Sequence, residues 1–376
     1  KTAWLEDGVA RLRALYRARM AAHQIKTIQA IAAESRLTAT ADWTQMARAQ
    51  LVIEATADDH VGDDLLRLIF TACHPVLPPE ARCALTLKVM GGLSTAEIAR
   101  AYLKPEATIA QRIVRAKRSL AAARVPCEVP RGAELVARLD SVLEVIYLIF
   151  NEGYAATSGE DWMRPALAEE AQRLGRVLAS LLPDQGEVLG LLALMEIQAS
   201  RFAARLSASG EPILLMDQDR SRWDPLLIRR GLDALARAEA LPGPLGPYAV
   251  QAAIAACHAR AARAADTDWS RIAALYDILA HIAPSPVVRL NQAVAVGMAF
   301  GAAAGLEIAD HVRAGGGLDG YPLLPAVRGD LLARLGRHDE ARAEFLRAAG
   351  LTRNARERAL LLARANASKG PPSEAR

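Results

Sequence analysis

The stretch that most constrains the fold of this chain is Leu93–Leu120, LSTAEIARAYLKPEATIAQRIVRAKRSL, which predicts two helices joined by a tight turn. Ser94 followed by Glu97 forms a capping box, in which the hydroxyl and the carboxylate each pair with a backbone N–H that the first helical turn leaves unsatisfied. Pro105 ends the first helix, because the residue before a proline is driven out of the α region and proline suits the first turn of a new helix.

The second predicted helix has one apolar stripe and an opposite face that is polar and basic. The stripe, at positions i, i+4, i+7 and i+11, consists of Ile109, Ile113, Ala116 and Leu120. The opposite face carries Ala107, Gln111, Val114, Arg115 and Arg118, flanked by Thr108, Arg112 and Lys117. A short capped helix followed by a helix with a basic outer face is typical of a helix-turn-helix. The alternative is an ordinary helical hairpin whose basic face is only solvated.

Composition favours an all-α protein. The 376 residues are 52% hydrophobic but only 5% aromatic, and alanine, leucine and arginine are abundant. The net charge of +4 is modest, so the basic charge is local. Lysines and arginines cluster between Lys104 and Arg131, where they face only two acids, Glu106 and Glu128. Such a concentrated stripe is typical of a surface that binds phosphates.

Several classes of protein are disfavoured. The cysteines, Cys73, Cys83, Cys127 and Cys257, form no CxxC pair, so we expect reduced and mostly buried thiols in a cytoplasmic protein. Cys73-His74 has no second pair at ligand spacing, so no metal or cofactor is expected. No enzyme motif, signal peptide or membrane-spanning run is present in the sequence. The chain begins with Lys1, so we expect further residues upstream.

A longer stretch, LIFTACHPVLPPEARCALTLKVMGGLSTAEIARAYLKPEATIAQRIVRAKRSL, resembles region 4 of the extracytoplasmic-function (ECF) subfamily of bacterial RNA polymerase sigma factors. Later strings, among them VIYLIFNEGYAATSGED, LLMDQDRSRWD and APSPVVRLNQAVAV, resemble the ECF subgroup with a tetratricopeptide-like helical extension. The resemblance implies that region 4 binds the promoter −35 element and docks on the β flap of the polymerase core.

Carried over to this sequence, the resemblance makes Glu106–Leu120 the recognition helix. The side chains expected to reach base edges are Thr108, Gln111 and Arg115. Those expected to contact phosphates are Arg112, Lys117 and Arg118. Ser94 and Thr95 could also donate to a phosphate from the positive end of the preceding helix, although capping alone explains Ser94.

Four parts are predicted along the chain. Residues 1–62 are interpreted as a remnant of sigma region 2 with linker helices, on a faint resemblance of Ala3-Trp4-Leu5 to the end of that region. Contact with the β' clamp of the polymerase would require a complete region 2. Residues 63–126 are region 4, residues 127–230 a helical connecting domain, and residues 231–376 tetratricopeptide-like repeats that bind an unknown protein partner.

Two features of the C-terminal part carry specific expectations. Two units near the end align with an offset of 37 residues, which pairs Ala304 with Ala341 and Ile308 with Phe345 and predicts stacked helical hairpins. A helix is expected over 187–206. The charged loop Asp217–Asp224 is interpreted as a salt-bridged lock between helices, with a ligand or divalent cation site as the alternative.

Three functions follow from these patterns. The first is a sigma factor in which region 4 recognises promoter DNA and the C-terminal part regulates it. The second is a helix-turn-helix regulator that does not bind polymerase, and the third is a helical-repeat scaffold with a vestigial DNA-binding module.

Overall fold

We describe the protein from a computed structural model. The structure describes residues 64–89, 93–102, 104–123, 125, 129–130, 132–156 and 162–368, which belong to one compact unit, Asp63–Arg376. The expected remnant of region 2 in residues 1–62, Cys127 and the tail from Pro371 lie outside the described residues.

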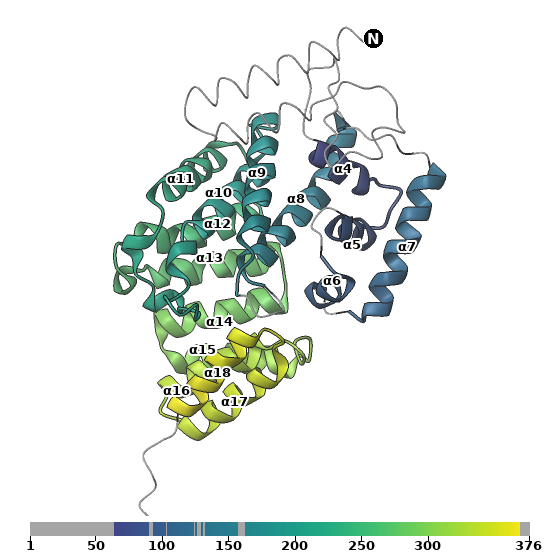
Figure 1. Cartoon of the computed structure of the whole chain (residues 1–376). Helices are drawn as coiled ribbons and strands as arrows, with labels where there is room; N and C mark the ends of the chain where they lie inside the picture. Colours follow the sequence, from purple (N-terminus) through teal and green to yellow (C-terminus); the bar gives the residue numbers. More distant parts are fainter. Residues whose placement is uncertain are drawn as a thin grey trace, which may run out of the picture. The chain divides into compact units, whose positions relative to one another are not determined.

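The described residues are helical and contain no β-strand, only an isolated bridge between Leu206 and Pro212. The α-helices are α4 (Asp64–Ala72), α5 (Pro79–Val89), α6 (Thr95–Ala101), α7 (Glu106–Ala123), α8 (Ala133–Tyr154), α9 (Pro165–Leu181), α10 (Gly186–Ala199), α11 (Pro225–Ala240), α12 (Pro247–Arg260), α13 (Trp269–Ile282), α14 (Pro286–Phe300), α15 (Ala302–Ala314), α16 (Leu323–Arg334), α17 (His338–Leu351) and α18 (Ala355–Ala367). Short 3₁₀ helices are η1 (Phe202–Ala204), η2 (Leu215–Asp217), η3 (Arg220–Arg222) and η4 (Ala264–Asp266). The predicted all-α fold is confirmed (Figure 1).

The helix-turn-helix is formed by α6 and α7. Both hydrogen bonds of the capping box are present: the Ser94 N–H donates to the Glu97 carboxylate at 2.6 Å, and the Glu97 N–H donates to the Ser94 hydroxyl at 3.1 Å. The turn is closed by the Lys104 N–H, which donates to the Ala99 carbonyl at 2.8 Å. Pro105 then stands directly before α7, as the sequence predicts.

Helix α8 joins this module to the rest of the unit. Arg138 donates to the Phe70 carbonyl in α4 at 3.3 Å, and Arg82 of α5 donates to the Ser141 hydroxyl at 3.1 Å. The Cys83 thiol of α5 donates to Glu144 at 3.1 Å. Cys73 and Cys83 are both buried, and burial raises the pKa of Cys73 to about 12. Cys257 is also a buried free thiol, so the predicted burial is confirmed for the cysteines in the described residues.

The helices after α8 pack through close backbone approaches. Gly190 in α10 lies so near Ala249 in α12 that a Cβ built on the glycine would stand 2.5 Å from the Ala249 nitrogen. Glu187, at the start of α10, accepts hydrogen bonds from the Tyr248 and Ala249 N–H groups at 2.9 and 3.1 Å. A carboxylate at the N-terminus of α12 satisfies two donors that the helix itself leaves free.

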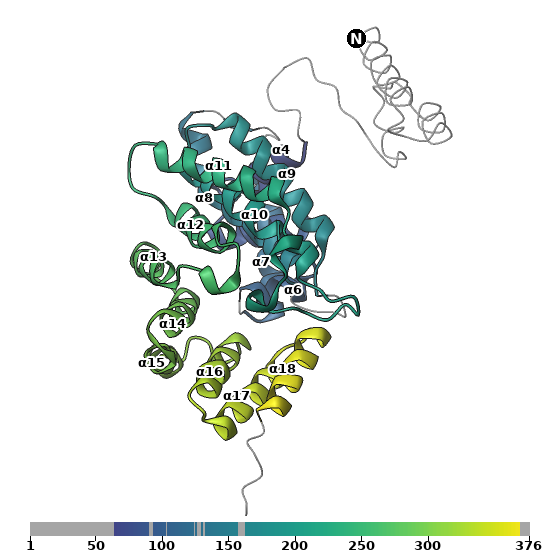
Figure 2. The same ribbon diagram turned by 90° about the vertical axis from the view of Figure 1, so that its left-hand side faces the viewer.

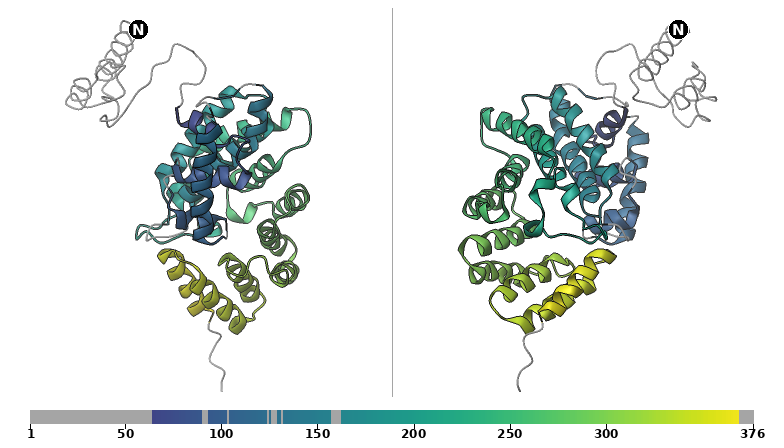
Figure 3. Two further views of the ribbon diagram at one scale, coloured as in Figure 1. Left: turned by 90° about the vertical axis from the view of Figure 1, so that its right-hand side faces the viewer. Right: turned by 60° about the vertical axis from the view of Figure 1, so that its left-hand side comes forward.

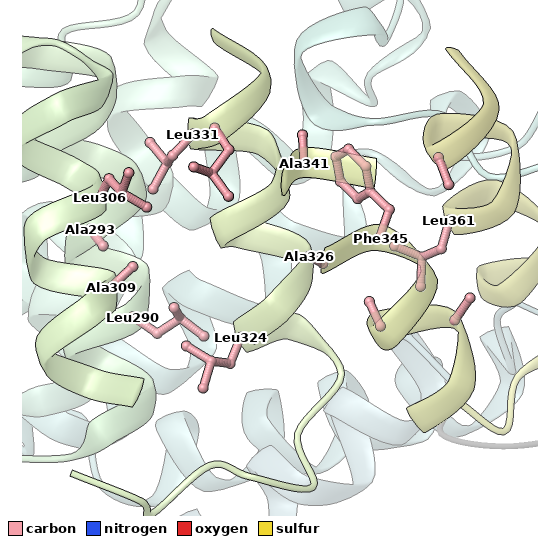
Figure 4. Close-up of a cluster of buried hydrophobic side chains, with 14 of the residues drawn as sticks. Leu290, Ala293, Leu306, Ala309, Leu324, Ala326, Leu331, Ala341, Phe345 and Leu361 are labelled. Atoms are coloured by element: carbon pink, nitrogen blue, oxygen red, sulfur yellow. The ribbon is translucent and has the colours of Figure 1, made fainter. Parts of the chain in front are cut away.

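From α14 onward the chain forms helical hairpins, α14 with α15 and α16 with α17 (Figure 2). The first helices of the two hairpins begin at Pro286 and Leu323, which agrees with the 37-residue offset of the sequence. Their shared core contains Leu290, Leu306, Leu331 and Phe345, drawn in Figure 4. The hairpins therefore bury apolar faces against one another, as stacked units must.

The last helix returns to earlier parts of the unit. Asn354, the N-cap of α18, donates to the Ala156 carbonyl at 3.2 Å, just after α8. Arg356 donates to the Ser209 carbonyl at 3.3 Å, in the loop that follows η1. Figure 3 shows this last helix, in yellow, from two further sides. In the described part of the chain no helix is both long enough and apolar enough to cross a bilayer.

Candidate nucleic-acid interface

Helix α7 buries one stripe and leaves the opposite face open. Ile109, Ile113 and Ala116 are buried against the module core, as predicted, whereas Leu120 is half-buried. Within the unit, α7 packs on α5 and α6 and runs along the edge (Figure 1).

The structure separates the predicted DNA-binding residues by exposure. The exposed side chains on α7 are Gln111, Arg115, Lys117 and Arg118. Thr108 is half-buried on the same helix. Val114, placed on this face but given no role by the sequence, is 49% exposed among these polar groups. An apolar side chain there suits contact with a thymine methyl group, a contact that a search for charged and amide residues misses.

Arg112 differs from the other cations because it already has a partner. Its guanidinium pairs with Glu80 of α5 at 2.6 Å, and the arginine side chain is only 26% exposed. The Glu80 side chain is 62% exposed, and a surface ion pair contributes about 0–1 kcal/mol. A DNA phosphate could therefore replace Glu80 at small cost, but Arg112 is not a free cation of the outer face.

At the start of α6, Ser94 is exposed and Thr95 half-buried. The Ser94 hydroxyl accepts the Glu97 N–H, so the capping role is shown, while phosphate contacts by Ser94 and Thr95 stay predictions. Glu97 also accepts from Arg164, just before α9, at 3.1 Å, and Arg164 reaches the buried Glu152 at 3.5 Å. The first helix of the motif is thereby tied to the C-terminal part of the unit.

The acids of the charged loop Asp217–Asp224 form no salt bridge with other described residues, so the loop is not the salt-bridged lock that the sequence suggested. Asp219 accepts from the Ser221 N–H and hydroxyl, and Asp224 caps α11 by accepting from the Leu226 and Leu227 N–H groups. Arg220 instead leaves the loop and donates to carbonyls at the end of α12. Among the residues that the structure describes, no group of three or more His, Cys, Asp or Glu side chains could hold a metal ion.

A capped first helix, a turn marked by Pro105 and a second helix with an exposed basic face define a helix-turn-helix DNA-binding module carried by a larger all-α protein. Comparison with known families agrees with this class. Residues 67–120 match the family described as "Sigma-70, region 4", and residues 138–239 match a "Family of unknown function (DUF6596)".

The chain is 45% identical over 302 residues to "Uncharacterized protein R00370" from Rhizobium meliloti (strain 1021), covering 80% of this chain and 71% of that protein. It therefore belongs to the same family as that protein, and its helix-turn-helix is a sigma-70 region 4. No solved structure matches the chain.

Proposed function

We propose that this protein is a sigma factor of the ECF subfamily, which recognises the −35 element of promoters through α7 and binds the RNA polymerase core to initiate transcription. The observation that carries the proposal is the open face of α7, where Gln111, Arg115, Lys117 and Arg118 are exposed on a region 4 helix-turn-helix. Cations and an amide on one helix face supply both affinity for phosphates and hydrogen bonds to base edges.

The four predicted parts of the chain have separate proposed roles. Residues 63–126 contact DNA and the β flap, and residues 1–62 contribute to clamp binding if region 2 is complete. Residues 127–230 connect region 4 to residues 231–376, whose tetratricopeptide-like hairpins bind a protein partner. Regulation is supported by the contacts of Glu97 with Arg164 and of Arg138 with Phe70, which join region 4 to the helices that follow it.

Association with polymerase tests the proposal. The full chain is mixed with purified bacterial core polymerase and analysed by size-exclusion chromatography, followed by transcription from promoters selected by genomic binding. Stoichiometric association and promoter-dependent transcripts are expected. Specific DNA binding without any association with polymerase would instead identify a helix-turn-helix regulator, and failure to bind DNA would leave only a scaffold.

Arg115→Ala and Lys117→Ala should weaken DNA binding in different ways. Arg115→Ala removes a proposed base contact, so we expect a loss of about 1–3 kcal/mol on the preferred duplex and a smaller loss on random duplex. Lys117→Ala removes a proposed phosphate contact, so affinity for both duplexes should fall alike. The slope of the logarithm of the binding constant against the logarithm of salt concentration should become shallower by about 1. Fluorescence anisotropy over a salt series, on a duplex selected from a random library, measures both effects.

The control for these variants is Arg237→Ala, which removes an exposed arginine from α11, far along the chain from region 4. It should leave affinity and salt dependence unchanged. For each variant, the loss of affinity for the preferred duplex is compared with the loss for the random duplex. If this ratio were the same for Arg115→Ala and Lys117→Ala, the assignment of Arg115 to bases would be wrong.

A further inference from the structure

Three arginines gather where the end of α8 meets the two 3₁₀ helices η1 and η3. Arg201 and Arg205 follow α10 and are only 8% and 6% exposed, while Arg220 in η3 is half-buried. The sequence did not indicate this cluster, because a helix was expected over 187–206 whereas α10 ends at Ala199. The early end of the helix places Arg201 and Arg205 on a 3₁₀ turn.

The guanidinium groups of this cluster lie against aromatic rings. Arg205 is 3.5 Å from the centroid of the Tyr154 ring and 5.9 Å from that of Trp162. Arg201 lies between Tyr154 and Trp223, at 5.6 and 5.7 Å, and Arg220 is 5.0 Å from Trp223. Cations and rings therefore alternate through the site, and each contact is a favourable cation–π interaction.

The hydrogen-bond partners of the cluster are neutral. Arg205 donates to the Tyr154 carbonyl, and Arg220 donates to the carbonyls of His258 and Ala261 and to the Thr267 hydroxyl. Within the described ranges, no carboxylate forms an ion pair with Arg201, Arg205 or Arg220.

The other buried arginines of the described residues behave differently. Arg138 is 4% exposed and pairs with Glu134 at 3.0 Å, and Arg328 is 5% exposed and pairs with Glu344 at 3.2 Å. Burying a guanidinium is costly unless an anion compensates its charge, and aromatic contacts offset only part of this cost. The cluster around Arg201 thus holds positive charge that no direct ion pair of the described residues neutralises; the nearest carboxylate effect is that of Asp266, which acts on Arg220 without pairing with it.

Three N–H groups of the arginines and Trp223 lack a hydrogen-bond partner. The Arg201 Nε, the Arg220 Nε and the indole Nε1 of Trp223 are buried N–H groups without a hydrogen-bond acceptor among the described residues. Trp223 is 5% exposed and Arg201 8% exposed, so these N–H groups are also withdrawn from solvent. Two arginine Nε–H groups and an indole N–H, all lacking acceptors, match the oxygen atoms of a phosphate or a carboxylate group.

The electrostatics of neighbouring groups agree with an excess of positive charge. Burial, followed by repulsion from Arg201 and Arg220, lowers the pKa of His258 to about 4. Burial lowers the pKa of Arg205 to about 10, with a contribution from Arg201, so Arg205 still carries its charge at neutral pH.

We propose that Arg201, Arg205 and Arg220, together with the indole N–H of Trp223, form a binding site for a multiply charged oxyanion, a phosphate or carboxylate group of a small molecule. The site is separate from the DNA-binding face, because its residues lie at the end of α8 and in the loops between α10 and α11. The competing explanation is a purely structural lock, in which the aromatic rings alone hold the arginines.

Binding of inorganic pyrophosphate and of citrate tests the site. Each is titrated into the full chain at constant ionic strength set with sodium chloride, using isothermal calorimetry for stoichiometry and thermal unfolding for stability. We expect one anion per chain and, at about 100 times Kd, a rise in Tm of about 3–4 °C. Binding of pyrophosphate alone would identify a phosphoryl ligand and binding of citrate alone a carboxylate ligand, and either result supports the site.

Three variants distinguish the site from the structural lock. Arg201→Gln should abolish the anion-dependent rise in Tm while leaving the Tm without anion unchanged or higher, because one of three like charges is removed. Arg205→Lys keeps the charge but loses the fork, so the anion should bind at least 10-fold more weakly. The matched control Arg222→Gln, which changes an exposed arginine of the same 3₁₀ helix, should bind as the wild type does.

The proposal is overturned if neither anion binds, or if the wild type, Arg201→Gln and Arg222→Gln show equal increases in Tm. A large loss of Tm in Arg201→Gln without anion, together with unchanged binding by Arg205→Lys, would establish the structural lock instead.

Discussion

Phe345→Ala should lower the free energy of unfolding of the C-terminal hairpins by about 3–5 kcal/mol, the usual cost of removing a buried phenyl ring from a packed core. The ring is 1% exposed and lies in the core shared by α14–α18 (Figure 4). It stands so close to Gly329 in α16 that a Cβ built on this glycine would lie 2.8 Å from the ring, and Arg364 of α18 lies 4.4 Å from the ring centroid. The Phe345 side chain of α17 therefore contacts both α16 and α18.

Stacked hairpins contact mainly their neighbours, so the loss should be local. We expect urea unfolding of Phe345→Ala, followed by circular dichroism, to show an early transition for α16–α18 before the main one. The matched control is Leu346→Ala on the same helix, where the side chain is 43% exposed and the cost should stay below about 1 kcal/mol. Equal costs for the two variants would show that Phe345 is not central to this core.

Region 4 could be predicted from the sequence because its signals are local. The capping box of Ser94 and Glu97, the stop at Pro105 and the stripe beginning at Ile109 each depend on residues at most four positions apart. The pairing of Arg112 with Glu80 could not be predicted, because it joins α7 to α5 across the turn between them and depends on how the two helices cross.

In the C-terminal part, the helical hairpins could be predicted from the sequence but the arginine cluster could not. The 37-residue offset predicted paired helices, and the structure has them, because a repeat displays the same apolar spacing twice. The arginine cluster was missed because it gathers Tyr154, Arg201 and Arg220 from separate stretches of the chain. The acids near Arg220 also misled the interpretation of its loop: Asp224 precedes Pro225, which is the local pattern of an N-cap followed by proline, and its carboxylate serves that cap.

The second large effect expected is a loss of stability in mild acid that depends on His258. Its imidazole is buried beside Trp269, with ring centroids 5.2 Å apart, and burial together with Arg201 and Arg220 lowers its pKa from 6.5 to about 4. Between these two pH values the unfolded chain binds a proton that the folded protein does not. The free energy of unfolding is therefore unaffected by His258 above pH 6.5. It decreases as the pH falls from 6.5 toward 4, by about 3 kcal/mol in total.

His258→Phe should remove this contribution, because phenylalanine keeps a ring against Trp269 but cannot be protonated. The free energies of unfolding of the wild type and the variant, measured in urea at pH 7, 5.5 and 4.5, should diverge in favour of the variant by about 2–3 kcal/mol at the lowest pH.

Chloride buffers are needed, since an oxyanion bound near Arg201 and Arg220 would offset the repulsion that His258 experiences. His281→Leu, at an exposed position of α13, serves as the control and should follow the wild type. If the free energies of unfolding of the wild type and His258→Phe changed equally with pH, the pKa of His258 would be the same in the folded and unfolded chain. Other groups would then compensate the charge of the arginine cluster.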